Sequence, residues 1–270
     1  MSSAQKIIKY VAIAFAVFLI FSIISGITIG IGTIATIFDD DDSITEELKL
    51  LDINGDAKIL DVDISASKLV IQRGDSLKAE TNNSYITCNQ DGNKLTITEK
   101  KHNWFHKSNQ SELLIYIPED FSFDAVSIQT GAGKVDIETL TTKKLYLDLG
   151  AGKVNIHDLN VSSQTSINGG AGAITVQKGI LSNLDLDMGV GKLVLNATLI
   201  GDSKIDSGVG SIDLNLVGDS SIYKIKLDKG IGSATINGNN MKDNTYYGNG
   251  SNTIDVDGGV GSIQIRYIDL

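Results

Sequence analysis

The sequence predicts an all-β protein, a single-domain β-solenoid of stacked coils of about 20 residues each, preceded by one N-terminal transmembrane helix. Three observations predict it: a long run without charge near the N-terminus, a glycine motif that recurs seven times, and strict alternation of apolar and polar residues around each copy. The 270 residues then divide into a short cytoplasmic N-terminus (1–9), a transmembrane anchor (10–38), an acidic linker (39–49) and an extracytoplasmic β-solenoid (50–270).

The anchor is predicted from the run 10–38, which contains no charged residue. About 20 apolar residues are enough to cross the hydrocarbon core of a bilayer. Lys6 and Lys9 precede the run and four aspartates (39–42) end it, so the excess of lysine places the N-terminus in the cytoplasm. We therefore expect a single-pass signal anchor in the cell membrane. The alternative is a signal peptide cleaved near Ala35, although the apolar core of such peptides is usually shorter, about 7–15 residues.

The composition excludes several classes of protein. The formal net charge is −10, and nucleic acid as the main partner would need clustered Lys and Arg. Cys88 is the single cysteine, which excludes an intramolecular disulfide framework and a multi-cysteine metal cluster.

The repeated unit reads Gly-(small or aliphatic)-Gly-x-aliphatic-x-aliphatic and begins at residues 131, 150, 170, 189, 208, 230 and 259. On both sides of it apolar residues recur with the strand period of two, as Leu147, Val154 and Ile156 do in the second copy. The parity slips by one at the two glycines, which predicts a tight corner that keeps the apolar face inward. A single coil buries too little apolar surface to be stable alone, so the coils have to stack.

Upstream of the repeats the pattern is degenerate. The segment 65–71 (SASKLVI) has serines in place of both glycines and starts 66 residues before Gly131, which predicts about three coils between them. Strands are expected at 58–64, 69–72, 95–98 and 112–117. Residues 43–130 form either the first part of the solenoid or a small β cap joined to it. At the other end, the segment 263–270 is expected to leave an open strand edge.

The repeats, most clearly GAGKVDI at 131, GAGKVNI at 150 and GVGKLVL at 189, resemble the bacterial "putative adhesin" family of membrane-anchored β-solenoid domains of unknown function. The resemblance covers residues 50–265. It implies a bacterial envelope protein, often encoded beside envelope-stress or membrane-regulatory systems. It implies no catalytic residues, because the family has no established active site.

Two loops interrupt the repeats and contain the candidate binding residues. The segment 100–110 (KKHNWFHKSNQ) holds Trp104 and Phe105, which either dock on a membrane or partner or plug one end of the core. The segment 238–252 (GNNMKDNTYYGNGSN) lengthens one repeat spacing to 29 residues and offers Tyr246 and Tyr247 as contact residues. The alternative for this second segment is a flexible connection.

An aspartate stands three positions before the middle residue in five of the seven motifs, with Gln129 and Asn168 at the same position in the other two. Stacking predicts a column on the outer surface, either solvated, or hydrogen-bonded, or bridged by cations such as calcium. The members of this cation column are Asp148, Asp187, Asp206, Asp228 and Asp257. Lysines at 134, 153 and 192 lie just after the second glycine, where they either neutralise an anionic polymer or are simply solvated.

No nucleophile elbow, Cys–His pair or metal-ligand cluster is recognisable, so no enzyme activity, no cofactor and no metal are predicted. The function predicted first is a membrane-anchored surface interaction module of the cell envelope, adhesin-like, with envelope proteins or cell-wall polymer as partners. The alternative is a regulatory partner of a membrane or envelope-stress signalling system. A polysaccharide-acting β-helix enzyme is the third reading, because such enzymes use pairs of aspartates on outer strands.

Overall fold

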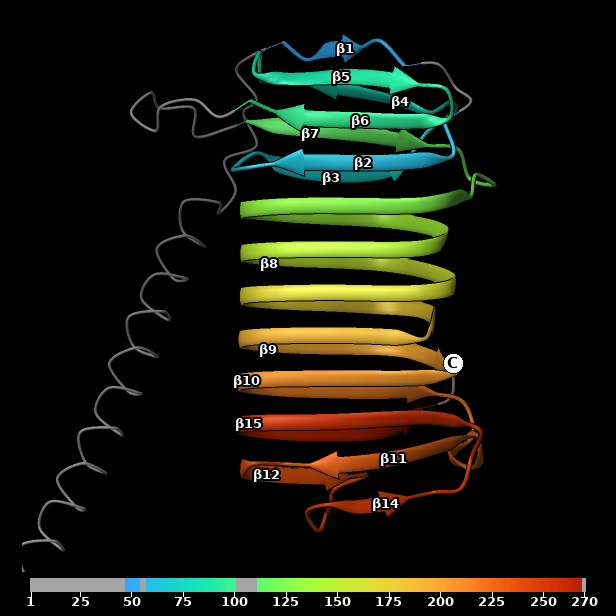
Figure 1. Cartoon of the computed structure of the whole chain (residues 1–270), viewed down its shortest axis with the longest axis vertical. Helices are drawn as coiled ribbons and strands as arrows, with labels where there is room; N and C mark the ends of the chain where they lie inside the picture. Colours follow the sequence, from blue (N-terminus) through green and yellow to red (C-terminus); the bar gives the residue numbers. More distant parts are fainter. Residues whose placement is uncertain (1–46, 54–56, 101–110, 269–270) are drawn as a thin grey trace, which may run out of the picture. The chain divides into compact units, whose positions relative to one another are not determined.

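The computed structural model describes residues 47–53, 57–100 and 111–268, which belong to one compact unit that spans Asp42–Leu270 (Figure 1). The described residues form one 15-stranded sheet, and their single helical element is a short 3₁₀ turn, η1. The predicted all-β class is therefore confirmed. The elements are β1 (Lys49–Leu51), β2 (Ile59–Ile64), β3 (Lys68–Arg73), β4 (Lys78–Thr81), β5 (Ile86–Asp91), β6 (Lys94–Glu99), β7 (Glu112–Ile117), β8 (Phe123–Ser182), β9 (Leu184–Ile200), β10 (Asp202–Val217), η1 (Ser220–Ile222), β11 (Tyr223–Asp228), β12 (Ile231–Ile236), β13 (Asn239–Asn240), β14 (Thr245–Tyr247) and β15 (Asn252–Ile268).

The predicted anchor (10–38) and most of the acidic linker lie outside the described residues. Within the described ranges, no helix has the length and the hydropathy to cross a membrane.

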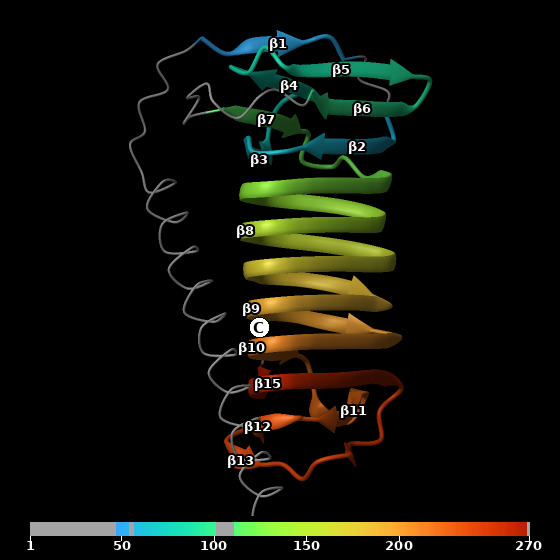
Figure 2. The same ribbon diagram turned by 60° about the vertical axis from the view of Figure 1, so that its left-hand side comes forward.

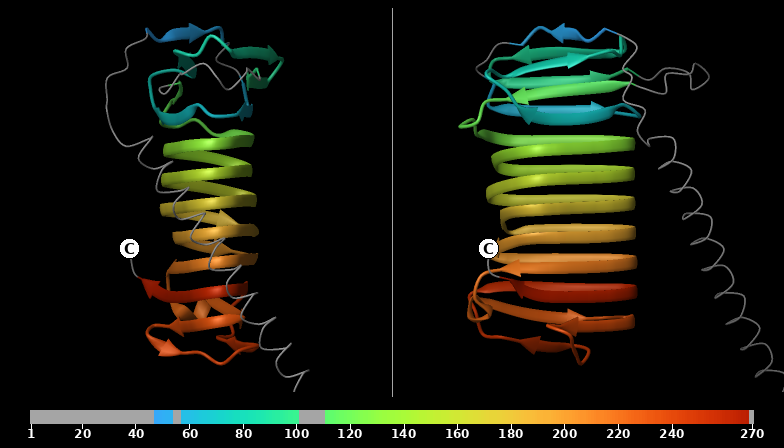
Figure 3. Two further views of the ribbon diagram at one scale, coloured as in Figure 1. Left: turned by 90° about the vertical axis from the view of Figure 1, so that its left-hand side faces the viewer. Right: turned by 180° about the vertical axis from the view of Figure 1, so that it is seen from behind.

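Each coil has two arms joined by a glycine corner, the name used here for the Gly-x-Gly of each motif. Arms that lead into the corner lie towards the viewer in Figure 1 and form the front face, and arms that leave it form the back face, seen directly in Figure 3. Successive coils pair in parallel and in register, so that Val190 lies beside Val209 and Leu193 beside Ile212. The coils therefore repeat the same positions at the strand spacing of about 4.8 Å.

The predicted core is confirmed. The apolar residues four positions before and three and five positions after each corner's middle residue are all buried, with at most 8% of any side chain exposed. Leu147, Ile167 and Leu186 lie in one continuous core cluster, as the stacking required. Inward residues alternate with outward ones on both arms, and the parity slips at the corner as predicted.

The second glycine of the corner explains why the motif needs glycine. At Gly152, Gly172, Gly191 and Gly210 φ lies between +144° and +152°, a region that L-residues rarely adopt. A Cβ at any of these positions would lie 1.8–1.9 Å from the carbonyl oxygen of the equivalent glycine in the neighbouring coil. The missing side chain is thus what allows two corners to stack in direct backbone contact.

The spatial order of the coils differs from their order in the sequence. β15 pairs in parallel with β10 on one side and with β11 and β12 on the other, so the last motif lies between the fifth and the sixth. Residues 218–251 leave a space beside β10 and form the next coil, β11–β12, further along the stack. The chain then turns back, and β15 fills the space between β10 and the β11–β12 coil. The predicted open edge is wrong for residues 263–265, where β15 is paired with β10 on one side and with β12 on the other. Residues 266–268 pair with β10, and residues 269–270 lie outside the described part of the chain.

At the N-terminal end, too, the spatial order of the coils differs from their order in the sequence (Figure 2). β2 and β3 pair directly with the first coil of β8, and Ser65 accepts a hydrogen bond from the backbone N–H of Ala132. The segment 65–71 is therefore adjacent to the first glycine motif, and the expected three intervening coils are wrong. The 66 residues between them are used by an outer coil, in which β6 pairs with β2 and β7 with β3.

Antiparallel strands close both ends of the stack. β5 pairs with β6, β4 with β7 and β1 with β4 at one end, and β13 pairs with β12 and β14 with β11 at the other. Residues 43–130 thus contain, where described, both solenoid coils and a small β cap. Switching from parallel to antiparallel pairing with strands of two to six residues keeps the exposed edges short.

Candidate functional site

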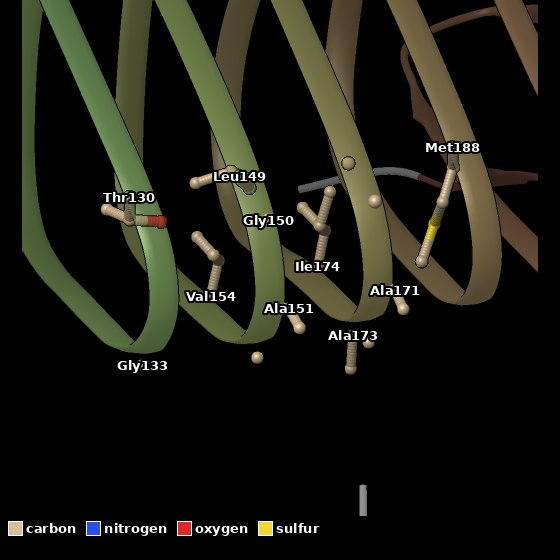
Figure 4. A pocket seen from close by; sticks show the side chains of 14 residues that line it. Thr130, Gly133, Leu149, Gly150, Ala151, Val154, Ala171, Ala173, Ile174 and Met188 are labelled. Atoms are coloured by element: carbon tan, nitrogen blue, oxygen red, sulfur yellow. The ribbon is translucent and has the colours of Figure 1, made fainter. Parts of the chain in front are cut away.

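The described residues leave only a small cavity beside the glycine corners. A cavity of about 20 Å³ there is lined by corner glycines together with Leu149, Val154, Ile174 and Met188 (Figure 4). This volume is close to the minimum that holds one water molecule, about 10–15 Å³. The surfaces that can contact a ligand are therefore the outer faces and the capped ends.

The predicted aspartate column exists on the front face, but in a different order. Asp187 lies beside Asp206, Asp206 beside Asp257, and Asp257 beside Asp228. Asp148 belongs to the same column but is separated from these four by Asn168, which is paired with Asp187. The change of order follows from the insertion of β15 between β10 and β11.

A second front-face column, two residues earlier in each arm, brings lysines next to the aspartates. It runs Asp185, Lys204, Asp255 and Lys226 through the same four coils. Lys204 bonds Asp206 at 2.5 Å and Lys226 bonds Asp255 at 3.1 Å. These bonds raise the pKa of both lysines, so they remain charged and offset part of the carboxylate repulsion.

Asp257 lies between two other carboxylates of the column, those of Asp206 and Asp228. Partial loss of hydration raises its pKa, and the negative charges of the neighbouring Asp228, Asp206 and Asp255 raise it further, because each of them disfavours ionisation of Asp257. In the described part of the chain, no three acidic, histidine or cysteine side chains converge as a metal site. A cation bridging the column stays a prediction.

The back face is different, because its polar residues bond to one another. A ladder that the sequence analysis missed lies six positions after each corner's middle residue. Its hydrogen bonds join His157 to Gln177 at 2.9 Å, Asn215 to Asn196 at 2.6 Å and Arg266 to Asn215 at 3.2 Å. The recurrence of Asn, Gln and His at this one position could have predicted it. Because their hydrogen-bonding groups are used within the ladder, these residues stabilise the stack rather than offer a binding surface.

The lysines after the second glycine are also largely neutralised. Lys134 lies 3.1 Å from Asp136, and Lys192 lies 3.6 Å from Asp213. Lys153 has no ion pair with any described residue. Of these three lysines, only Lys153 therefore has a charge that is available to an anionic polymer.

The predicted contact residues of segment 238–252 belong to the C-terminal cap. The expected flexible connection is wrong, because this segment contributes β13 and β14 and covers β12 and β11. Tyr247 packs against the core, and its hydroxyl accepts a hydrogen bond from the N–H of Lys242 at 2.7 Å. Tyr246 is 61% exposed, with the ammonium of Lys224 at 5.0 Å from its ring centroid. Of the two tyrosines, only Tyr246 is largely exposed. Trp104 and Phe105 lie outside the described residues.

A sequence model of the family described as Toastrack DUF4097 matches residues 60–256, which is most of the solenoid. The chain belongs to the Toastrack DUF4097 family. The family match runs from β2 into β15 and so includes both places where this Toastrack chain stacks its coils out of sequence order. No protein of curated function matches it.

Solved structures similar to this Toastrack chain come from several bacteria. A "putative adhesin" from Bacteroides fragilis has a TM-score of 0.48 at 17% identity, with 83% of this chain and 98% of that chain covered. A "putative cell adhesion protein" from Clostridium sporogenes has a TM-score of 0.38 at 20% identity, with 83% and 99% covered. A "putative lipid binding protein" from Parabacteroides distasonis has a TM-score of 0.34 at 14% identity, with 83% and 98% covered. Identities this low do not transfer a ligand to this chain.

Proposed function

We propose that this Toastrack chain is a non-catalytic interaction module of the bacterial cell envelope, an adhesin-like surface domain held at the cell membrane by residues 10–38. The observation that carries the proposal is the unbroken register of the front face. Register repeats each outward position from coil to coil, which gives a regular surface suited to an extended or repetitive ligand.

The orientation in the membrane is part of this proposal. Its support is the charge-free run 10–38, with Lys6 and Lys9 before it and four aspartates after it. After residue 38 the sequence has 21 basic and 33 acidic residues, which favours solubility outside the membrane and discourages contact with anionic lipid. Envelope proteins and cell-wall polymer are the partners that we propose.

The exposed Tyr246 is the contact residue that the described part of the chain supports best, since tyrosine combines a large apolar ring with a polar tip. Trp104 and Phe105 remain proposed contacts on the sequence alone, and Tyr247 acts through the packing of the cap. The five aspartates of the column are proposed as a cation-responsive surface rather than as a built metal site.

The experiment compares the full chain with residues 39–270. A surface module should bind isolated envelope fragments equally well in both forms, with binding reduced several-fold by Tyr246→Ala and unchanged by Tyr85→Ala, a second exposed tyrosine at the opposite cap. An effect that needs the anchor would instead favour a regulatory partner of a membrane system. Release of sugars from the fragments would contradict the non-catalytic proposal.

A further inference from the structure

We propose that a depression on the front face around Tyr146 binds an acidic glycan, meaning sugar or sugar-alcohol units that carry carboxylate or phosphate groups. This inference rests on the proposed function as a surface module, for which it names a site and a ligand class. The depression lies across β2, β6 and the first coils of β8, at the opposite end of the solenoid from Tyr246.

The shape follows from which side chains the register brings together. Ile59 lies beside Ala125 and Asp61 beside Ser127, and the next coil places Lys144 and Tyr146 at the equivalent positions. The small side chains in the middle leave a depression of about 380 Å³ between larger neighbours. Its outward lining consists of Lys94, Ile59, Ala125, Lys144 and Gln164 in one column and Asp61, Ser127, Tyr146 and Ser166 in the other.

The size suits a short oligosaccharide. Ligand sites usually enclose about 300–1,000 Å³, and the longer lining column crosses five coils, a distance of about 19 Å at the strand spacing. The depression is open to solvent and its outward lining is polar apart from Ile59 and Ala125. A polar, hydroxyl-rich chain fits such a lining better than an acyl chain does.

Tyr146 supplies an aromatic surface for a sugar ring. Its side chain is 37% exposed, and its hydroxyl lies 3.4 Å from Oδ2 of Asp148, which directs the side chain along the strand. Aromatic rings bind the C–H faces of sugars through apolar contact, while nearby polar groups bond the hydroxyls. Gln164, Ser127 and Ser166 provide such groups around the ring.

Lys144 selects an anionic ligand. It is exposed, and no carboxylate among the described residues lies within ion-pair distance of it. Lys94 is bonded to Asp61 at 2.8 Å, and the preceding Lys143 is bonded to Asp124 at 2.7 Å. The depression therefore has one uncompensated positive charge on a domain that is otherwise acidic, and this favours binding of a negative group there.

The test measures binding of three probes to the full-length chain in detergent by titration calorimetry. The probes are a hyaluronan hexasaccharide (carboxylate), a glycerol phosphate oligomer (phosphate) and maltohexaose (neutral), so the two acidic probes distinguish the sources of the charge. We expect at least one acidic probe to bind, and to bind more weakly at high salt. The neutral probe should bind at least about tenfold more weakly than that acidic probe.

Variants then assign the site. Tyr146→Ala should weaken binding of the acidic probe about tenfold and Lys144→Gln several-fold, whereas Tyr146→Phe should bind like the original chain. Lys143→Gln is the matched control. It removes the same charge from the adjacent lysine, which is already paired with Asp124. Unchanged far-UV circular dichroism of each variant shows that the fold is kept.

Three outcomes overturn the proposal: neither acidic probe binds at millimolar concentration, the neutral probe binds equally well, or Tyr146→Ala and Lys144→Gln bind like Lys143→Gln. Binding to envelope fragments separates this failure from failure of the proposed function. If the fragments bind the original chain and Tyr146→Ala alike, the surface module stands and the site does not. If they bind neither while an acidic probe binds at Tyr146, the site stands and the surface module does not.

Discussion

The second glycine of the corner should not tolerate even alanine, and Gly191 is the position that tests this most directly. Its φ is +147°, and a Cβ built on it would lie 1.8 Å from the carbonyl oxygen of Gly172 in the neighbouring coil and 2.8 Å from Cε of Met188. Because Cβ atoms essentially never approach another atom closer than 3.0 Å, the two corners would have to move apart by at least about 1.2 Å.

The free energy of unfolding falls for three reasons: backbone strain, lost hydrogen bonds and loosened packing. Adopting such a φ costs an L-residue about 1–3 kcal/mol. Separating the two corners by a quarter of the strand spacing breaks hydrogen bonds between these two coils, at about 1 kcal/mol each, and loosens the core packed beneath them. We expect a loss of at least about 4 kcal/mol, against a total stability of about 5–15 kcal/mol for an ordinary domain.

Two matched substitutions separate the clash from the backbone strain. At Gly133, the second glycine of the first motif, a Cβ would lie 3.3 Å from the carbonyl oxygen of Ser67, so Gly133→Ala should cost less than about 1 kcal/mol. Gly238 has φ of +79° but no atom within 4 Å of a Cβ, so Gly238→Ala should cost only the strain of about 1–2 kcal/mol.

The assay is urea denaturation of the three variants followed by far-UV circular dichroism, with the midpoints expected in the order Gly133→Ala, Gly238→Ala, Gly191→Ala from high to low. Failure of Gly191→Ala to fold while Gly133→Ala folds would agree with the expectation. Equal midpoints for these two variants would refute the reasoning, because Gly133 occupies the same motif position without the close contact and without the positive φ, while Gly238→Ala reports the cost of the positive φ alone.

Three further predictions concern the chain order, the acidic column and the cysteine. Truncation after Ser251 removes β15, an interior coil, so limited proteolysis should trim the protein back to about Val217; continued protection of β11 and β12 would contradict the observed pairing. Asp257→Asn should raise the melting temperature slightly at pH 7 and less at pH 4 or in high salt, with Asp148→Asn as the neutral control. The sign follows because a raised pKa means that the folded state binds the proton more tightly, so stability falls as pH rises through that pKa. Burial, followed by the charge of Asp52, raises the pKa of the Cys88 thiol. Its alkylation by iodoacetamide at pH 7.5 should therefore be several-fold slower than after unfolding in urea, and equal rates would count against this environment.

Local pattern was enough to predict the coil, because everything that defines it recurs within 20 residues. The alternation that buries Leu147, Val154 and Ile156, and the glycines that turn the chain between them, are properties of neighbouring positions. The predicted strands at 58–64, 69–72, 95–98 and 112–117 correspond to β2, β3, β6 and β7 within one or two residues for the same reason.

The depression around Tyr146 could not be predicted, because it depends on which coil lies beside which. Its small residues, Ala125 and Ser127, face Ile59 and Asp61 only because β2 lies directly beside the first coil of β8. In sequence order an outer coil would have stood between them. The depression therefore follows from the order in which the coils stack rather than from any one motif.

The spatial order of the coils nevertheless correlates with one feature of the motifs, the size of the middle residue of each glycine corner. In space, the middle residues of the corners run Ala132, Ala151, Ala171, Val190, Val209, Val260 and Ile231, so their size rises step by step along the stack. In the sequence Ile231 interrupts the valines. Side chains at the same position of adjacent coils are about 4.8 Å apart and contact one another, so neighbours of equal size pack without gaps or overlap. The near-identity of GVGSIDL at 208 and GVGSIQI at 259 is thus a physical reason for these two coils to be neighbours. The 74% exposure of Ile231 marks the outermost glycine corner at that end of the stack.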